Sequence, residues 1–108
     1  MSAYRKGLRA KAVENIALVK EFYDRYQSRI VKGLAVYGEF QPESDNRCLS
    51  EELIEELLDC GSYLDFIEQK YPSMRLDAQK IRAKVILLYG EAKKLKDTEL
   101  ILAREGDA

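Results

Sequence analysis

Apolar residues recur every three or four positions along most of this chain, a spacing typical of amphipathic α-helices and incompatible with the alternation of a half-buried strand. The pattern predicts a first helix over residues 9–32, and Gly33 directly after it favours a helix end. Its apolar stripe consists of Ala12, Ile16, Val19, Tyr23, Tyr26 and Ile30, widened by Val13, Phe22 and Val31.

A second helix is predicted over residues 50–70, with Ser50 as its N-cap and Tyr71-Pro72 at its end. Glu51 and Glu52 lie in the first turn, where the helix dipole favours anions. We expect its buried side to consist of Leu53, Ile54, Leu57, Leu58, Leu64 and Ile67.

A third helix is predicted from Ser73, a second N-cap candidate, to near the C-terminus, with residues 105–108 frayed. Its main stripe consists of Ile81, Val85, Leu88, Ala92, Leu95 and Leu102. Ile86, Leu87 and Tyr89 make this helix apolar on more than one side. The sequence therefore predicts one all-α domain over residues 1–108, a bundle of three main helices that a partner chain completes to four or more helices.

Residues 34–49 interrupt the helical period. Gly, Pro and Asx residues lie close together in Tyr37-Gly38-Glu39-Phe40-Gln41-Pro42-Glu43-Ser44-Asp45-Asn46, which is turn chemistry. The predicted loop is long for a domain of this size, and long ordered loops often carry function.

The chain has 108 residues, with 18 basic and 19 acidic side chains and no His. The lack of His excludes a Ser-His-Asp or Cys-His apparatus and His-ligated zinc. The net charge of −1 argues against a nucleic-acid partner, although basic residues gather near the N-terminus and on the third helix.

The N-terminus lacks the apolar core of a signal peptide, and the longest apolar run, residues 85–89, is far too short to span a bilayer. We therefore expect a cytoplasmic protein without a membrane partner. Cys48 and Cys60 are expected to be reduced thiols, with Cys60 a small core residue.

Five carboxylates occur between residues 51 and 59 without a basic residue among them. Helical spacing places four on one face, at i, i+3, i+4 and i+7: Glu52, Glu55, Glu56 and Asp59. Carboxylates one turn apart suit Mg²⁺, which polarises phosphoryl oxygens and acidifies bound water, and a remaining Glu, Glu55 or Glu56, can orient or deprotonate that water. The alternative interpretation is a solvated acidic face.

The region from Lys32-Gly33 to Tyr63-Leu64 resembles the short MazG-like branch of the all-α nucleoside triphosphate pyrophosphohydrolases, found in phages and bacteria. The ordered features are a KG pair, a YG pair at Tyr37-Gly38, Arg47 in the loop, and an acidic helix EE-x-x-E-E-x-x-D followed by Tyr-Leu. The resemblance covers about a third of the chain.

This resemblance implies a magnesium-dependent enzyme, with Mn²⁺ as a substitute, that cleaves a nucleoside triphosphate into a monophosphate and pyrophosphate. It also implies a homo-oligomer, a dimer or tetramer, with sites near subunit interfaces. By position, the four acidic residues correspond to the metal-binding set. Lys32 and Arg47 are candidate phosphate contacts and Tyr37 a candidate base-stacking residue.

One departure concerns the two acidic halves, which in larger MazG proteins lie on separate helices and here adjoin on one. Glu21 and Asp24 on the first helix offer a possible second half, a partner subunit is another source, and a degenerate, inactive site is a third possibility. With Lys20 and Arg25 adjacent, Glu21 and Asp24 also fit an ordinary mixed-charge face. A non-catalytic interaction module remains the alternative function.

Overall fold

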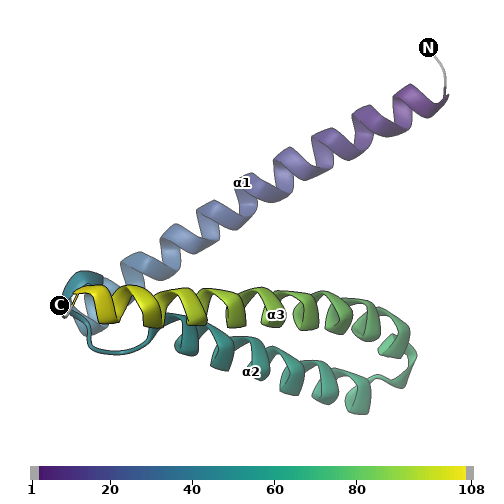
Figure 1. Ribbon diagram of the computed structural model, residues 1–108. Helices are drawn as coiled ribbons and strands as arrows, with labels where there is room; N and C mark the ends of the chain where they lie inside the picture. The colour runs from purple at the N-terminus through teal and green to yellow at the C-terminus, as the bar shows by residue number, and fades with distance from the viewer. Residues whose placement is uncertain (1–2, 107–108) are drawn as a thin grey trace. The chain divides into compact units, whose positions relative to one another are not determined.

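The computed structural model describes the backbone of residues 3–106 and the side chains of residues 14–36 and 38–106. Three long helices dominate it, namely α1 (Ala3–Tyr37), α2 (Leu49–Lys70) and α3 (Arg75–Gly106) (Figure 1). Short 3-10 turns occupy Pro42–Ser44 and Pro72–Met74. The described residues contain no strand, so the predicted all-α class is confirmed.

The chain divides between Asp45 and Asn46 into two compact units, which we describe separately. The first unit is α1 with the start of the following loop. The predicted end at Gly33 is wrong, because α1 continues through this glycine to Tyr37. Gly38 ends the helix instead. Its φ of +78° is in the left-handed region, and its amide donates to the carbonyl of Leu34 at 3.0 Å, closing the final turn.

The second unit is an antiparallel hairpin of α2 and α3 (Figure 1). The predicted N-cap at Ser50 is wrong, because Cys48 occupies that position and Ser50 lies within the first turn. Tyr71 ends α2 as predicted, with Pro72 preventing continuation. Ser73 lies in the short 3-10 turn rather than at the N-cap, and α3 starts at Arg75, one residue later than a cap at Ser73 predicts.

The two helices of the hairpin meet along a narrow seam. Four apolar side chains are buried there, Ile54 and Leu64 from α2 and Ala78 and Ala92 from α3. Apart from Glu51 and Glu52 in the first turn of α2, the other buried or half-buried positions of the two helices continue at alternating steps of three and four, which is the heptad spacing of a coiled-coil contact: Ser50, Leu57, Gly61 and Glu68 on α2, and Arg82, Val85, Tyr89, Lys96 and Glu99 on α3.

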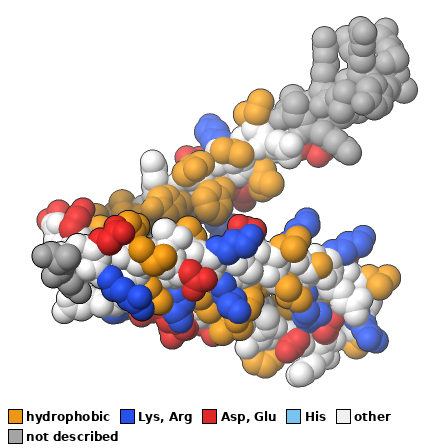
Figure 2. Space-filling model, viewed as in Figure 1, with side chains coloured by type: hydrophobic (Ala, Val, Ile, Leu, Met, Phe, Trp, Pro, Cys, Tyr) orange, Lys and Arg blue, Asp and Glu red, His pale blue; other side chains and the backbone are white. Residues whose placement is uncertain are grey.

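The apolar stripes predicted from the sequence are wider than the seam that is actually buried. Leu53 and Leu58 of α2 remain 43% and 58% exposed, and on α3 the predicted Ile81, Leu88, Leu95 and Leu102 are all about half exposed. A pair of helices buries only the residues that face the partner helix, so the outer columns of a broad apolar side stay uncovered. Figure 2 shows such hydrophobic side chains at the surface of α1 and of the hairpin.

The two flanks of the seam differ. On one flank the guanidinium of Arg82 pairs with the carboxylates of Asp65 at 2.9 Å and Glu68 at 3.1 Å, and Lys96 pairs with Glu51. The opposite flank carries two columns of apolar side chains, spaced by seven, which we call the hairpin apolar face: Leu53, Cys60 and Ile67 of α2, and Ile81, Leu88, Leu95 and Leu102 of α3.

Both cysteines are free thiols, as expected. The expectation that Cys60 is a core residue is wrong, because its column lies outside the seam and its side chain is exposed. Among the described residues, no helix combines the length and the apolar character that crossing a membrane requires.

Candidate functional site

The acidic residues of α2 occupy the side of the helix that faces away from α3. The helix is continuous from Leu49 to Lys70 and its seam follows Ile54, Leu57 and Leu64. At 100° per residue, Glu52 and Asp59 project almost opposite this seam, with Glu55 and Glu56 on either side of them. Glu55, Glu56 and Asp59 are exposed and Glu52 is half-exposed, so the outer face of α2 is a row of carboxylates.

The fifth acidic residue, Glu51, has a different role. Its carboxylate pairs with the ammonium of Lys96 on α3, and this contact raises the pKa of Lys96. None of the four outer carboxylates has an ion-pair partner within the described part of the chain. The fold thus separates one acidic residue that joins the helices from four that point to solvent.

Two exposed aromatic residues continue the same outer face. Tyr63 and Phe66 are 68% and 60% exposed, and their rings meet edge to face with centroids 6.5 Å apart. They lie one to two turns beyond Asp59 on α2, so the carboxylate row ends in an uncovered aromatic pair.

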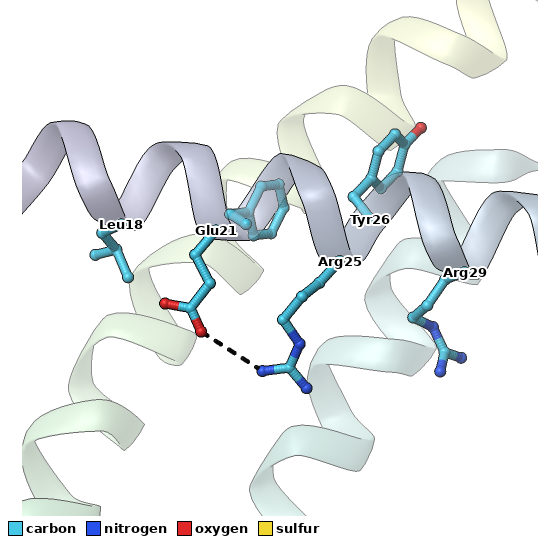
Figure 3. A pocket seen from close by; sticks show the side chains of 6 residues that line it. Leu18, Glu21, Arg25, Tyr26 and Arg29 are labelled. Atoms are coloured by element: carbon cyan, nitrogen blue, oxygen red, sulfur yellow. Dashed lines mark ion pairs between the residues drawn. The ribbon is translucent and has the colours of Figure 1, made fainter.

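The candidate residues of α1 lie on that unit's own surface. Figure 3 shows Glu21 beside Arg25, with 3.9 Å between the carboxylate and guanidinium, in a shallow hollow of about 370 Å³ that Phe22 and Tyr26 also line. An exposed i, i+4 pair of this kind is what a mixed-charge helix face provides.

Asp24 and Lys32 line a second shallow hollow on α1, of about 470 Å³, together with Gln27, Ser28 and Val31. The structure therefore brings one candidate carboxylate and one candidate phosphate contact onto the same side of α1. Arg47 lies exposed in the loop before α2. Tyr37 is the last residue of α1, and its side chain lies outside the described residues.

The outer face of α2 fits a hard divalent cation in the chemistry of its donors, which are all carboxylate oxygens. Among the residues described, however, no three Asp, Glu, Cys or His side chains converge on a point where a metal ion would be held. A metal ion at these four residues, which lie at successive turns of one helix, would need further ligands from elsewhere.

The start of α2 contains a cluster that the sequence pattern did not reveal. Glu99 of α3 accepts hydrogen bonds from the amide of Ser50 at 3.2 Å and from its hydroxyl at 3.1 Å. A hydrogen bond from the Cys48 thiol and those from Ser50 lower the pKa of Glu99, and the same contact raises the pKa of Cys48. An amide in the first turn of the acidic helix therefore finds its hydrogen-bond acceptor on a residue about fifty positions away, which only tertiary packing brings close.

The structure defines the class of this protein as an all-α chain with an antiparallel helical hairpin. Comparisons of the chain with protein-family models, with curated proteins and with solved structures found no match.

Proposed function

We propose that this protein is a Mg²⁺-dependent nucleoside triphosphate pyrophosphohydrolase, which cleaves an NTP or dNTP into a nucleoside monophosphate and pyrophosphate. The observation that carries the proposal is the row of four carboxylates on the outer face of α2, without ion-pair partners among the described residues. Like charges one turn apart repel each other, and a divalent cation removes that repulsion. The motifs that resemble those of MazG-like enzymes, and that occur in the same order, support the same function.

The proposed roles follow from the chemistry of each side chain. Glu52, Glu55, Glu56 and Asp59 hold the Mg²⁺, for which Mn²⁺ can substitute. The ion supplies polarisation of a phosphoryl oxygen and a more acidic water. Glu55 or Glu56 orients the attacking water and accepts its proton. Lys32 and Arg47 bind phosphate oxygens, and Tyr37 stacks on the base.

The remaining ligands are proposed to come from Glu21 and Asp24 or from a partner subunit in a homo-oligomer, a dimer or tetramer. Asp24 shares its side of α1 with Lys32, which supports a role of this side of α1 at the phosphates. The proposal also includes a cytoplasmic location, without a membrane or nucleic-acid partner.

The direct test measures pyrophosphate release from a panel of ribo- and deoxynucleoside triphosphates with Mg²⁺ or Mn²⁺. The proposal predicts turnover of at least one substrate, with equal amounts of monophosphate and pyrophosphate and none after chelation of the metal. A folded protein that turns over no member of the panel would refute it. Release of inorganic phosphate and a nucleoside diphosphate would refute the assigned cleavage position.

A second candidate function is a non-catalytic interaction module, a degenerate relative of such enzymes. The exposed pair Tyr63 and Phe66 next to the carboxylate row favours it, because a basic partner with an apolar patch would find both complementary groups on one helix face. This function predicts binding to the outer face of α2 that is independent of divalent metal.

A further inference from the structure

We propose that the hairpin apolar face is the interface of a twofold-symmetric dimer, in which the hairpin of a second copy completes a four-helix bundle. The inference deepens the homo-oligomer part of the proposed function by naming the surface and its symmetry. It is argued from the geometry of α2 and α3 alone, and it holds whether or not the protein hydrolyses nucleotides.

The first argument is the composition of this face. None of its seven side chains is charged, and on α3 the exposed fractions of Leu88, Leu95 and Leu102 are 55%, 55% and 60%. The other flank of the seam is mixed, because the ion pairs of Arg82 and Lys96 lie there beside the exposed Leu58 and Ile86. A contiguous apolar face on one side of a hairpin is typical of an interaction surface.

The second argument is the register of the two helices. The contacts Ser50–Glu99, Glu51–Lys96 and Asp65–Arg82 place Cys60 of α2 level with Leu88 of α3, to within about one residue. Cys60 is the middle member of its apolar column, between Leu53 and Ile67. Leu88 is the second of four members of its column, with Ile81 and Leu95 seven residues away on either side. The parts of the two columns over residues 53–67 and 81–95 are therefore centred at the same height along the hairpin, and Leu102 extends beyond them.

A twofold axis at this height, perpendicular to the helices and in the plane of the interface, matches the face to itself. Leu88 then meets Leu88 of the second copy, and Cys60 meets Cys60 of the second copy. Ile81 packs against Leu95 of the second copy. All neighbouring helices run antiparallel, as in an up-down bundle.

The third argument is charge complementarity at the edge of the face. The column of α3 next to the apolar column contains Lys84, four residues before Leu88, and Glu91, three residues after it. The same axis brings Lys84 opposite Glu91 of the second copy, and does so twice. Glu91 is 70% exposed and its partner within the chain, Lys94 at 3.4 Å, is also exposed, so the carboxylate can reach a second cation.

The size of the face fits such a dimer. At 1.5 Å per residue its columns extend about 20 Å along α2 and about 30 Å along α3, and two helices side by side are about 20 Å wide. The projected area is then on the order of 500 Å², and the accessible area of the side chains is larger. This is comparable to the ~800 Å² per partner of an ordinary specific interface.

The first test compares dimer dissociation constants of the full chain, without nucleotide, by analytical ultracentrifugation. Lys84→Glu places like charges opposite each other twice and should weaken the dimer by about tenfold or more. The double variant Lys84→Glu with Glu91→Lys exchanges the two charges and should restore it. Lys80→Glu, the same change on the side of α3 away from the apolar face, should have little effect.

The second test uses Cys60 as a reporter in a Cys48→Ser background, with diamide as the oxidant. Two Cys60 thiols of one dimer should form an intermolecular disulfide rapidly, as their two electrons and two protons pass to diamide. Cys60→Ser in the same background should give no cross-link.

A monomer at about 50 µM would overturn the inference. So would a dimer that is insensitive to Lys84→Glu and whose Cys60 does not cross-link, because the face would then have another occupant, such as the apolar stripe of α1 or a different protein. A dimer that passes both tests but releases no pyrophosphate would contradict the proposed hydrolysis and leave this interface supported.

Discussion

At the scale of single residues, Glu99 joins the start of the acidic helix to α3. Its carboxylate accepts hydrogen bonds from both the backbone and the side chain of Ser50, at the end of α2 where amides lack partners within the helix. An anion at this end also interacts favourably with the helix dipole. The start of the helix that presents Glu52 and Glu55 is thus attached to α3.

Replacement of Glu99 by Gln should lower the melting temperature of the hairpin by roughly 2–5 °C at about pH 7, because it removes the charge but keeps the shape. The pKa of Glu99 is lowered from its ordinary value of 4.5, so the carboxylate stabilises the fold above that pH. The stabilisation disappears as the pH falls through the lower pKa of the folded state. The two proteins should therefore converge as the pH falls well below 4.5, in thermal melts followed by circular dichroism. A constant difference across the pH range would contradict the role of the charge.

The Ser50 N-cap prediction failed for a physical reason at this same scale. Ser50 is followed by Glu51 and Glu52, which is a common start of a helix, and sequence alone gives no reason to prefer Cys48. The choice depends on Glu99, which already occupies the hydrogen-bonding groups of Ser50 from α3. A contact between residues 49 positions apart cannot be recognised from a local sequence pattern.

At the scale of elements, the hairpin depends on small residues at its seam. Ala78 and Ala92 are each 3% exposed and allow α2 to approach α3 closely. Gly61, another small residue, lies half-buried on the side of α2 that forms the seam. Close approach brings Arg82 within reach of Asp65 and Glu68, so the packing and the ion pairs depend on each other.

Replacement of Ala92 by Leu should destabilise the hairpin by about 1–3 kcal/mol, because the larger side chain has no space at the seam and must push the helices apart. The matched control is Ala83→Leu, the same change at an exposed position of α3, which should change stability by less than about 0.5 kcal/mol. Urea denaturation of both variants measures the difference. Equal effects at the two positions would show that the seam lies elsewhere.

The elements themselves were largely predictable from sequence, but the seam was not. Helical periodicity and Tyr71-Pro72 place α2 and α3 to within a few residues. Leu53, Leu58 and Leu88 are as apolar as Ile54 and Leu64, so hydrophobicity cannot say which of them faces the partner helix. Heptad spacing and small residues mark the seam, and a broad apolar side hides both signals. Gly33 shows the same limit, because a glycine can end a helix or lie within it.

At the scale of the whole molecule, the acidic and basic side chains are nearly balanced in number but not in position. Four carboxylates share the outer face of α2, and the bases nearest in sequence lie outside this group, Arg47 in the loop before α2 and Lys70 about three turns beyond Asp59 at the end of the helix. The spacing of these four was predictable, because it requires only that residues 52–59 be helical. Which residues would complete the proposed metal shell was not predictable, since no local pattern encodes tertiary or quaternary contacts.

Mg²⁺ together with a non-hydrolysable nucleoside triphosphate should raise the melting temperature of the protein, because a ligand that binds only the folded state stabilises it by mass action. At 100 times its dissociation constant the gain is about 2.7 kcal/mol. Asp59→Asn should abolish this shift, and Asp97→Asn, at an exposed position of α3, should retain it. Thermal melts with and without metal distinguish the enzyme from the interaction module, which predicts no dependence on metal.

The proposed function is tested most directly by pyrophosphate release from the wild-type protein and two alanine variants under identical conditions. With Mg²⁺ and its best nucleotide, the wild type should release pyrophosphate and monophosphate in equal amounts. Glu56→Ala and Asp59→Ala should abolish release while helix content, measured by circular dichroism, stays unchanged, and Asp97→Ala should remain active. Undiminished activity in the first two variants, or their loss of fold, would contradict the assignment of the outer face of α2 as the metal site.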